Sequence, residues 1–420
     1  MKLKRLPEDF RVEELPLVEP GARGRYTFYR LEKRDLGTLE AIDQVRSRWG
    51  IEARRLAYGG LKDRHAHTIQ YLTIFEGPEQ AIKFAKFELQ PLGRLDRPYG
   101  PTEFSGNRFG IVIRDLAAPA LERALRAAET LEHDGLPNYF DDQRFGSVGP
   151  GGAFTARAWL LGDAETALRL AIAESTASDR TTSRAEKAIL SECWGNWAEA
   201  KARLGKSHAR SIATYLVDHP TDFRGAFSRL RRDLRGLYFS AFQSHLWNQI
   251  VGRLIEMTTR PDQRVSYRFK VATLPIHFNL DDDQARLLRS AQVPLPSSRN
   301  APPEGPLGVA AQAVVAEQGL TWEALRVRWL KDVFFSKGTR PALVFPTNLK
   351  LSDTNDELYP KRRLLRLSFE LPRGGYATLL VKRLTNAAAE HESRASTALD
   401  DSDFSGVEDA ADDDRDPADD

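Results

Sequence analysis

The chain of 420 residues has very little of what builds disulfide frameworks, multi-cysteine zinc sites or membrane spans. Its only cysteine, Cys193, excludes a disulfide framework and a multi-cysteine zinc site, and it indicates a reducing compartment. The N-terminus lacks the apolar core of a signal peptide, and no later apolar run reaches the length of a membrane-spanning helix. We therefore expect a cytoplasmic protein without a membrane anchor, long enough for two domains.

The formal net charge of +2 conceals two oppositely charged parts. Residues 387–420 hold 13 acidic and 2 basic side chains, whereas residues 1–386 hold 59 basic and 46 acidic ones, so the tail carries −11 and the body +13. The body is basic enough to attract a polyanion such as a nucleic acid. The tail has too few apolar residues to bury and is predicted to be disordered, either as a solubilising extension or as a competitor of the polyanion for the basic surface.

Strand and helix signals alternate over residues 1–150. Apolar residues at helical spacing predict one helix that ends at Gly50 and a second over residues 119–133, with Gly135 just past its end. Residues 109–113 are typical of a strand. The glycine-rich break at residues 149–152 then introduces a helix-rich stretch of different composition, and it is a candidate domain boundary.

Strand signals return near the C-terminus, at residues 364–369 and 377–381, joined through residues 372–375. We expect this hairpin to complete the sheet begun by the first part of the chain. The middle of the chain would then be an insertion.

The octet Gly59-Gly60-Leu61-Lys62-Asp63-Arg64-His65-Ala66 sets one carboxylate among three side chains that can carry positive charge. Strands are predicted over residues 54–58 and 69–75, so Asp63 lies on a strand-to-strand connection. Neighbouring cations would favour its ionised form and so a nucleophile or base at neutral pH. From these residues alone, a solvated loop ion pair is the commoner interpretation.

Five stretches resemble, in the same order, the motifs of the TruD family of tRNA pseudouridine synthases. The octet around Asp63 resembles the family's catalytic signature. The other four stretches are Lys4 with Pro7-Glu8-Asp9-Phe10, Asn138-Tyr139-Phe140-Asp141-Asp142-Gln143-Arg144-Phe145-Gly146, residues 240–248 and residues 371–378. One residue departs from the pattern, because Asp141 stands where the family usually has glycine.

The resemblance implies an α+β fold: a pseudouridine-synthase-like catalytic domain built on a mostly antiparallel sheet flanked by helices, with a helix-rich α/β insertion domain and a disordered acidic tail. It also implies an isomerase that converts uridine to pseudouridine in tRNA, at position 13, as a monomer that needs no cofactor and no metal. The expected parts are residues 1–150 and 343–386 for the catalytic domain, residues 151–342 for the insertion domain and residues 387–420 for the tail.

The resemblance also assigns the site residues. Asp63 is the expected nucleophile, and it could attack the anomeric carbon of the sugar or abstract a sugar proton; the sequence leaves both routes open. Lys4 is its expected charge partner. A base that has been flipped out of the RNA needs an aromatic wall and a polar group that reads its edge. The expected residues for this binding are Phe10, Asn138, Phe140 and Tyr376.

Other functions stay open at this stage. A catalytically silent RNA-binding or RNA-chaperone protein would keep the basic surface, but it would have no need of Asp63 beside Lys4. A metal-dependent nuclease is disfavoured because the acidic residues outside the tail do not cluster, and the pair His65 and His67 has no ligand cluster beside it. Arginine-rich stretches at residues 224–235 and 361–363 are candidate phosphate contacts.

Overall fold

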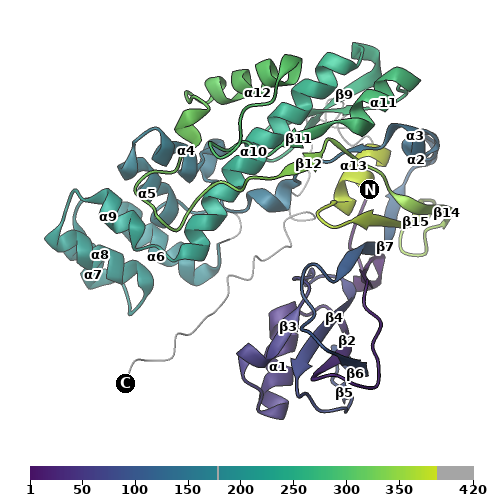
Figure 1. Cartoon of the computed structure of the whole chain (residues 1–420), viewed down its shortest axis with the longest axis horizontal. Coiled ribbons are helices and arrows are strands. Elements are labelled where there is room, and N and C mark those ends of the chain that lie inside the picture. The colour runs from purple at the N-terminus through teal and green to yellow at the C-terminus, as the bar shows by residue number, and fades with distance from the viewer. Residues whose placement is uncertain (177–178, 386–420) are drawn as a thin grey trace. The chain divides into compact units, whose positions relative to one another are not determined.

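The computed structural model describes residues 1–176 and 179–385 (Figure 1). Over this range the chain forms two compact units: the first from Met1–Leu136 together with the chain from Val344 onward, and the second from Pro137–Leu343. The chain passes from one unit to the other at β8 (Leu136–Pro137) and β13 (Leu343–Val344). The first unit is thus discontinuous in sequence, with the second inserted into it.

The first unit is organised around a nine-stranded sheet in the order β14-β15-β7-β1-β4-β2-β6-β5, with β3 paired to β4. Only β1 and β4 run parallel, and the other pairings are antiparallel. The expected mostly antiparallel sheet is therefore confirmed. Its strands are β1 (Phe10–Pro16), β2 (Tyr26–Arg34), β3 (Leu56–Tyr58), β4 (His67–Phe75), β5 (Ile82–Lys83), β6 (Phe87–Leu95), β7 (Phe104–Leu116), β14 (Thr347–Asn355) and β15 (Arg363–Pro372).

Helices cover this sheet at two places. Helix α1 (Thr38–Trp49) buries Ala41, Ile42 and Val45 against strands β2, β4 and β6. It ends at Gly50, whose φ of 64° lies in the left-handed region that favours glycine. Around β7 and β15 the core is covered by α2 (Ala118–Glu129), α3 (Leu131–Asp134) and α13 (Ala377–Thr385). The helix expected over residues 119–133 is thus present, interrupted at Thr130.

The strand expected over residues 377–381 is wrong, because these residues begin helix α13. A short apolar run of this kind fits a strand or a buried helix equally well by periodicity. Tertiary packing decides it: Leu380, Val381 and Leu384 share a helical face in the same core as Leu121 and Ala124 of α2. The strand expected over residues 364–369 is confirmed as part of β15, which pairs with β7 and so does complete the sheet.

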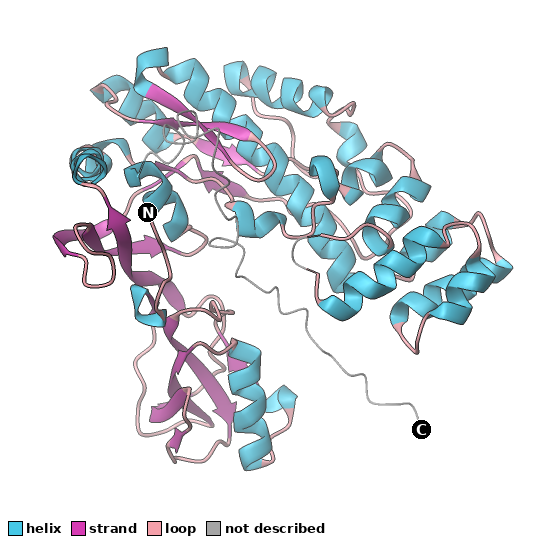
Figure 2. Ribbon diagram, turned by 180° about the vertical axis from the view of Figure 1, so that it is seen from behind, coloured by secondary structure: helices cyan, strands magenta, loops and turns pink. Residues whose placement is uncertain are grey.

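The second unit is built around α10 (Arg232–Thr258), which contacts helices and strands on several sides (Figures 1 and 2). The apolar residues of α10 that recur at helical spacing, Phe242, Leu246, Ile250 and Leu254, are all buried. The other elements are α4 (Thr155–Leu160), α5 (Ala164–Ile172), α6 (Thr181–Glu192), α7 (Trp197–Arg203), α8 (His208–Asp218), α9 (Phe223–Ser228), α11 (Asp282–Ser290), α12 (Gly305–Glu317), β9 (Arg264–Arg268), β10 (Thr273–His277), β11 (Gln292–Pro294) and β12 (Thr339–Pro341).

One boundary expected from the sequence differs from the structure, and the expectation for the tail is not tested by it. The glycine break at residues 149–152 lies inside the second unit, where Pro150–Gly152 forms a 3₁₀ turn. The acidic tail expected over residues 387–420 lies outside the described residues. Among the residues that are described, no helix combines the length and the apolar composition needed to cross a membrane.

Candidate active site

Asp63 lies on the connection between β3 and β4, as the strand pattern predicts. Gly59 opens this connection beside packed rings, and a Cβ atom there would meet the side chain of Phe104 at 2.9 Å and that of Tyr99 at 3.1 Å. The Lys62 amide donates to Thr38 Oγ1 at 3.0 Å, which ties the connection to the start of α1. The backbone around Asp63 is therefore fixed by a strand, a helix and two aromatic side chains.

Lys4 forms an ion pair with Asp63, with 2.8 Å between Nζ and Oδ2. The two side chains are 21% and 22% exposed, so the pair is partly shielded from water but remains reachable by a ligand. The ammonium also lies 4.2 Å from the centroid of the Phe10 ring. Three expected site residues, contributed by the N-terminal segment and the octet, are thus brought together in the first unit.

The N-terminal segment that carries Lys4 is itself anchored in the first unit. Lys2 exchanges two backbone hydrogen bonds of 2.9 Å with Arg114 of β7. The Arg114 guanidinium contacts both carboxylate oxygens of Asp9, and the two side chains are 3% and 2% exposed. Asp9 therefore has a structural role, since it fixes the motif from which Lys4 reaches Asp63 and Phe10 contacts Lys4.

Lys33 is a buried lysine that the sequence interpretation missed. Its Nζ donates to the backbone carbonyl of Leu36 at 2.6 Å and to that of Asp63 at 2.8 Å, and its side chain is inaccessible to solvent. Burial lowers the pKa of Lys33 to about 8, although the Asp63 carboxylate opposes the shift. Alternation along β2 could have revealed it, because Lys33 falls on the same buried face as Tyr29 and Leu31.

Glu14 is a second buried charge that the sequence interpretation missed. Its carboxylate is 2.8 Å from Lys62 Nζ, and it accepts hydrogen bonds from the Tyr71 amide at 3.0 Å and the Tyr99 hydroxyl at 3.2 Å. Burial and this carboxylate raise the pKa of Tyr99 far above its usual range. Lys62 is thus turned inward, where it ties the octet to β1.

Arg64 and His65 of the octet, and His67 just after it, also contact carboxylates of the first unit. Arg64 lies 2.8 Å from Glu40, His65 lies 2.9 Å from Asp35, and His67 lies 2.6 Å from Glu32. Throughout the described part of the chain, no three His, Cys, Asp or Glu side chains gather as metal ligands. The two histidines of the pair contact different carboxylates, His65 that of Asp35 and His67 that of Glu32.

Phe10 and Tyr376 occupy different settings in the first unit. Phe10 is 6% exposed and packs edge-on against Phe109, with 6.4 Å between the ring centroids. One side of its ring faces the Lys4 ammonium. Tyr376 is partly buried between the turn that follows β15 and the start of α13, where its carbonyl accepts a hydrogen bond from the Leu379 amide.

Asn138 and Phe140 belong to the second unit. The Asn138 amide donates to the Pro341 carbonyl at 3.0 Å and accepts from the Arg340 guanidinium at 2.9 Å, and its side chain is buried. The Phe140 ring is 9% exposed, meets Trp247 edge-on at 5.6 Å and lies 4.2 Å from the Arg340 guanidinium. Both side chains therefore help to hold their own loop.

The motif at residues 240–248 includes a residue of α10 that holds the loop of Phe140 in place. Asn248 of α10 accepts a hydrogen bond from the Phe140 amide and donates one to the Phe140 carbonyl, both at 2.8 Å. Asp141, the departure from the family pattern, has a φ of −86°. Since this is ordinary backbone geometry for any residue, Asp141 needs no glycine-like conformation.

Comparison with known proteins supplies the family. A family model described as tRNA pseudouridine synthase D (TruD) matches residues 1–384. The chain is 30% identical over 397 residues to "Probable tRNA pseudouridine synthase D 2" of Methanocaldococcus jannaschii, covering 91% of each protein. It is 26% identical over 392 residues to tRNA pseudouridine synthase D of Aquifex aeolicus, covering 91% of this chain and 98% of the relative.

A solved structure agrees with these sequence matches. The crystal structure of a protein assigned to TruD from Methanosarcina mazei matches with a TM-score of 0.72 and 26% identity, over 92% of this chain and 93% of the other. The family match extends over both units, and it includes the connection that carries Asp63 and the segment that carries Lys4. The chain therefore belongs to the TruD family of tRNA pseudouridine synthases, isomerases that convert uridine to pseudouridine in tRNA.

Proposed function

We propose that this chain modifies uridine 13 of tRNA, with Asp63 as the nucleophile and Lys4 as its charge partner. The observation that carries the proposal is the 2.8 Å pair between Lys4 and Asp63, on a connection whose backbone is fixed by the buried Lys33. A carboxylate held in one orientation is suited to attack a sugar carbon. A catalytically silent RNA-binding protein would gain nothing from holding this carboxylate so closely.

The chemistry needs only this carboxylate and a bound base. In one route, an Asp63 oxygen bonds to the anomeric carbon while the bond from that carbon to the uracil nitrogen breaks. The uracil turns in place, its carbon C5 bonds to the anomeric carbon, the bond to Asp63 breaks, and the proton on C5 is lost. In the other route, Asp63 removes the proton from the sugar carbon next to the anomeric carbon, and the uracil leaves to give a glycal. The uracil C5 then bonds to the anomeric carbon, Asp63 returns its proton to the sugar carbon, and the proton on C5 is lost. Lys4 orients the carboxylate in both.

We assign the binding of the flipped base to Phe10, Phe140, Tyr376 and Asn138. Aromatic rings return part of the cost of unstacking a base, at roughly 1–3 kcal/mol for each stacked base. The amide of Asn138 has the donor and acceptor that a pyrimidine edge requires, and its hydrogen bonds to Pro341 and Arg340 support a second role in holding the loop. From the sequence we further propose a cytoplasmic monomer that needs neither cofactor nor metal.

The proposal is tested by Asp63→Asn, which keeps the shape of the side chain but removes its charge. Loss of a nucleophile is expected to lower turnover by about 10⁴–10⁶-fold, whereas tRNA affinity should stay within a few-fold because a carboxylate adds little to binding a polyanion. Pseudouridine would be mapped in the tRNA after carbodiimide treatment.

The matched control is Asp43→Asn, which removes an exposed carboxylate of α1 that pairs with Arg46. This variant should retain wild-type turnover. If Asp63→Asn keeps more than a tenth of the wild-type rate, Asp63 is not the nucleophile. A pseudouridine at another tRNA position would contradict the assignment to position 13 alone.

A further inference from the structure

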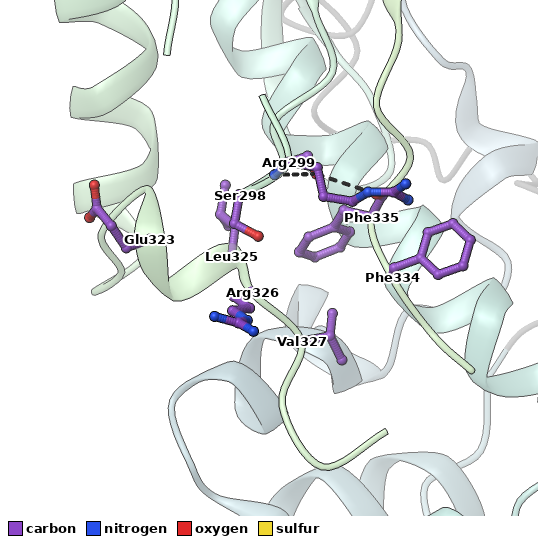
Figure 3. A pocket seen from close by; sticks show the side chains of 9 residues that line it. Ser298, Arg299, Glu323, Leu325, Arg326, Val327, Phe334 and Phe335 are labelled. Carbon is purple, nitrogen blue, oxygen red and sulfur yellow. Dashed lines mark hydrogen bonds between the residues drawn. The ribbon is translucent and has the colours of Figure 1, made fainter. Parts of the chain in front are cut away.

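One segment of the second unit turns large aromatic side chains toward solvent. Phe334 is 57% exposed, whereas its neighbour Phe335 is 2% exposed and packs on Phe239 and Phe242 of α10 at 5.8 and 6.5 Å between ring centroids. Figure 3 shows the two rings on opposite sides of the segment that carries them, and both line one cavity. The inward ring anchors the segment, so the outward ring is presented by a fixed support.

Hydrogen bonds make this support rigid. The Gln243 amide of α10 donates to the carbonyls of Pro296 and Ser336 at 2.9 and 2.8 Å and accepts from the Ser336 amide at 3.2 Å. The Ser297 hydroxyl donates to the Phe335 carbonyl at 3.3 Å. The backbone on both sides of the cavity is thus tied to one buried helix, and the exposure of Phe334 is a fixed property of the fold.

Positive charge accompanies the exposed ring. The Arg299 guanidinium lies 4.8 Å from the centroid of the Phe334 ring, and the cavity of about 470 Å³ beside them is also lined by Arg326 (Figure 3). Glu323 is the acidic residue of this lining. Neither arginine has an ion-pair partner among the residues that the structure describes. An aromatic ring and two cationic side chains are therefore among the residues that line one cavity of ligand size.

The same pairing recurs a few residues earlier in the segment. Trp329 is 73% exposed, and the Arg224 guanidinium lies 5.2 Å from its ring centroid. The φ of Trp329 is 71°, a left-handed conformation that costs about 1–2 kcal/mol for a residue with a Cβ atom. In the sequence between Trp329 and Phe334, Asp332 forms an ion pair with the buried Arg235. Its carboxylate therefore does not offset the positive charges of the exposed Arg328 and Lys331.

We propose that Phe334, Arg299 and Arg326 bind an unstacked nucleotide of the RNA substrate, at a contact separate from the base that reacts. A base stacks on the Phe334 ring, and the two guanidinium groups receive its phosphates. An acidic peptide would use the cations but would leave the flat ring without a matching partner. We call these three residues the Phe334 site. The identity of its ligand rests on the proposed function, since the RNA is taken to be the tRNA that the enzyme modifies.

The test is the affinity of full-length protein for tRNA, measured for wild type, Phe334→Ala and Phe334→Trp. Loss of one stacking ring should weaken binding by roughly 5- to 150-fold, and tryptophan should restore it. Turnover at saturating tRNA should stay near wild type, because the reacting base is held elsewhere. The control is Phe84→Ala, which removes a 40% exposed ring of the first unit that packs on Phe87.

Arg299→Gln tests the phosphate contact independently. It should weaken binding and lower the slope of log affinity against log salt by about one. Since binding is measured without catalysis, a failure of the proposed activity would leave this test intact. Unchanged tRNA affinity in both Phe334→Ala and Arg299→Gln overturns the proposal. Polyglutamate serves as the probe for an acidic peptide. If the two variants lose binding to polyglutamate while their tRNA binding is unchanged, the proposal is also overturned, and the surface is identified as a protein-docking surface.

Discussion

Lys33 is the residue whose position says most about how the Asp63 carboxylate is held. A lysine rarely occupies a site without solvent contact, because burial penalises its charge. Here the cost is offset by three backbone carbonyls, those of Leu36, Lys62 and Asp63. We infer that Lys33 is a positioning residue that acts on the Asp63 backbone, while Lys4 acts on the Asp63 side chain.

Lys33→Met should therefore reduce turnover while leaving tRNA affinity nearly unchanged. Methionine fills the space but donates no hydrogen bond, and buried carbonyls left without a donor cost about 1–3 kcal/mol each. A displacement of about 1 Å at Asp63 is enough to lower kcat on the order of 10²-fold. Single-turnover kinetics would measure the effect, with the exposed Lys83→Met as control. Equal losses in affinity and kcat would instead point to general unfolding of the first unit.

The lowered pKa of Lys33 also predicts a pH dependence of stability. Its pKa falls from 10.5 to about 8 in the folded protein, so between these values the unfolded chain binds more protons than the folded one. Stability therefore rises with pH over this window. The free energy of unfolding of wild type relative to Lys33→Met should increase between pH 7.5 and 9.5, as measured by urea denaturation. A difference that does not change with pH would mean that Lys33 titrates as an exposed lysine.

The elements were predictable from sequence where local signals and tertiary packing agree. Helix α1 follows its apolar spacing and ends at a glycine that adopts φ of 64°. Helix α13 was not predictable, because its apolar run has no local feature that separates strand from helix. The two hydrogen bonds between the Asn248 side chain and the Phe140 backbone join residues 108 positions apart, and no local sequence pattern predicts such a contact. Alternation along β2 contained the signal for Lys33.

The helix α13 is held by a buried ion pair that can be tested directly. Arg383 donates to Asp134 at 2.9 Å, and the two side chains are 1% and 0% exposed. Arg383→Met should destabilise the first unit by about 3–5 kcal/mol, because it leaves Asp134 as a buried charge without this partner. Adding Asp134→Asn should recover much of the loss in a double-mutant cycle, followed by denaturant unfolding. If the two losses simply add, the pair does not stabilise α13.

At the scale of the whole molecule, the charge of the chain is divided between a body of +13 and a tail of −11. The secondary-structure elements described in the structure end at Thr385, one residue before Asn386. Removal of the tail therefore takes away none of these elements. A long acidic segment attached to a basic RNA-binding body is expected to occupy part of the surface that loosely bound RNA would use.

Truncation after Asn386 should accordingly tighten binding to unrelated RNA, chiefly at low salt. The difference should fade towards physiological ionic strength, where a Debye length of about 8 Å screens a tethered chain from the body. Affinities for a nonspecific RNA would be compared across a salt series for the full chain, the truncated chain and a full-length variant whose tail carboxylates are replaced by amides. If charge is the cause, the amide variant should behave like the truncated chain, whereas coinciding curves for all three proteins at low salt would leave the tail without any role in RNA competition.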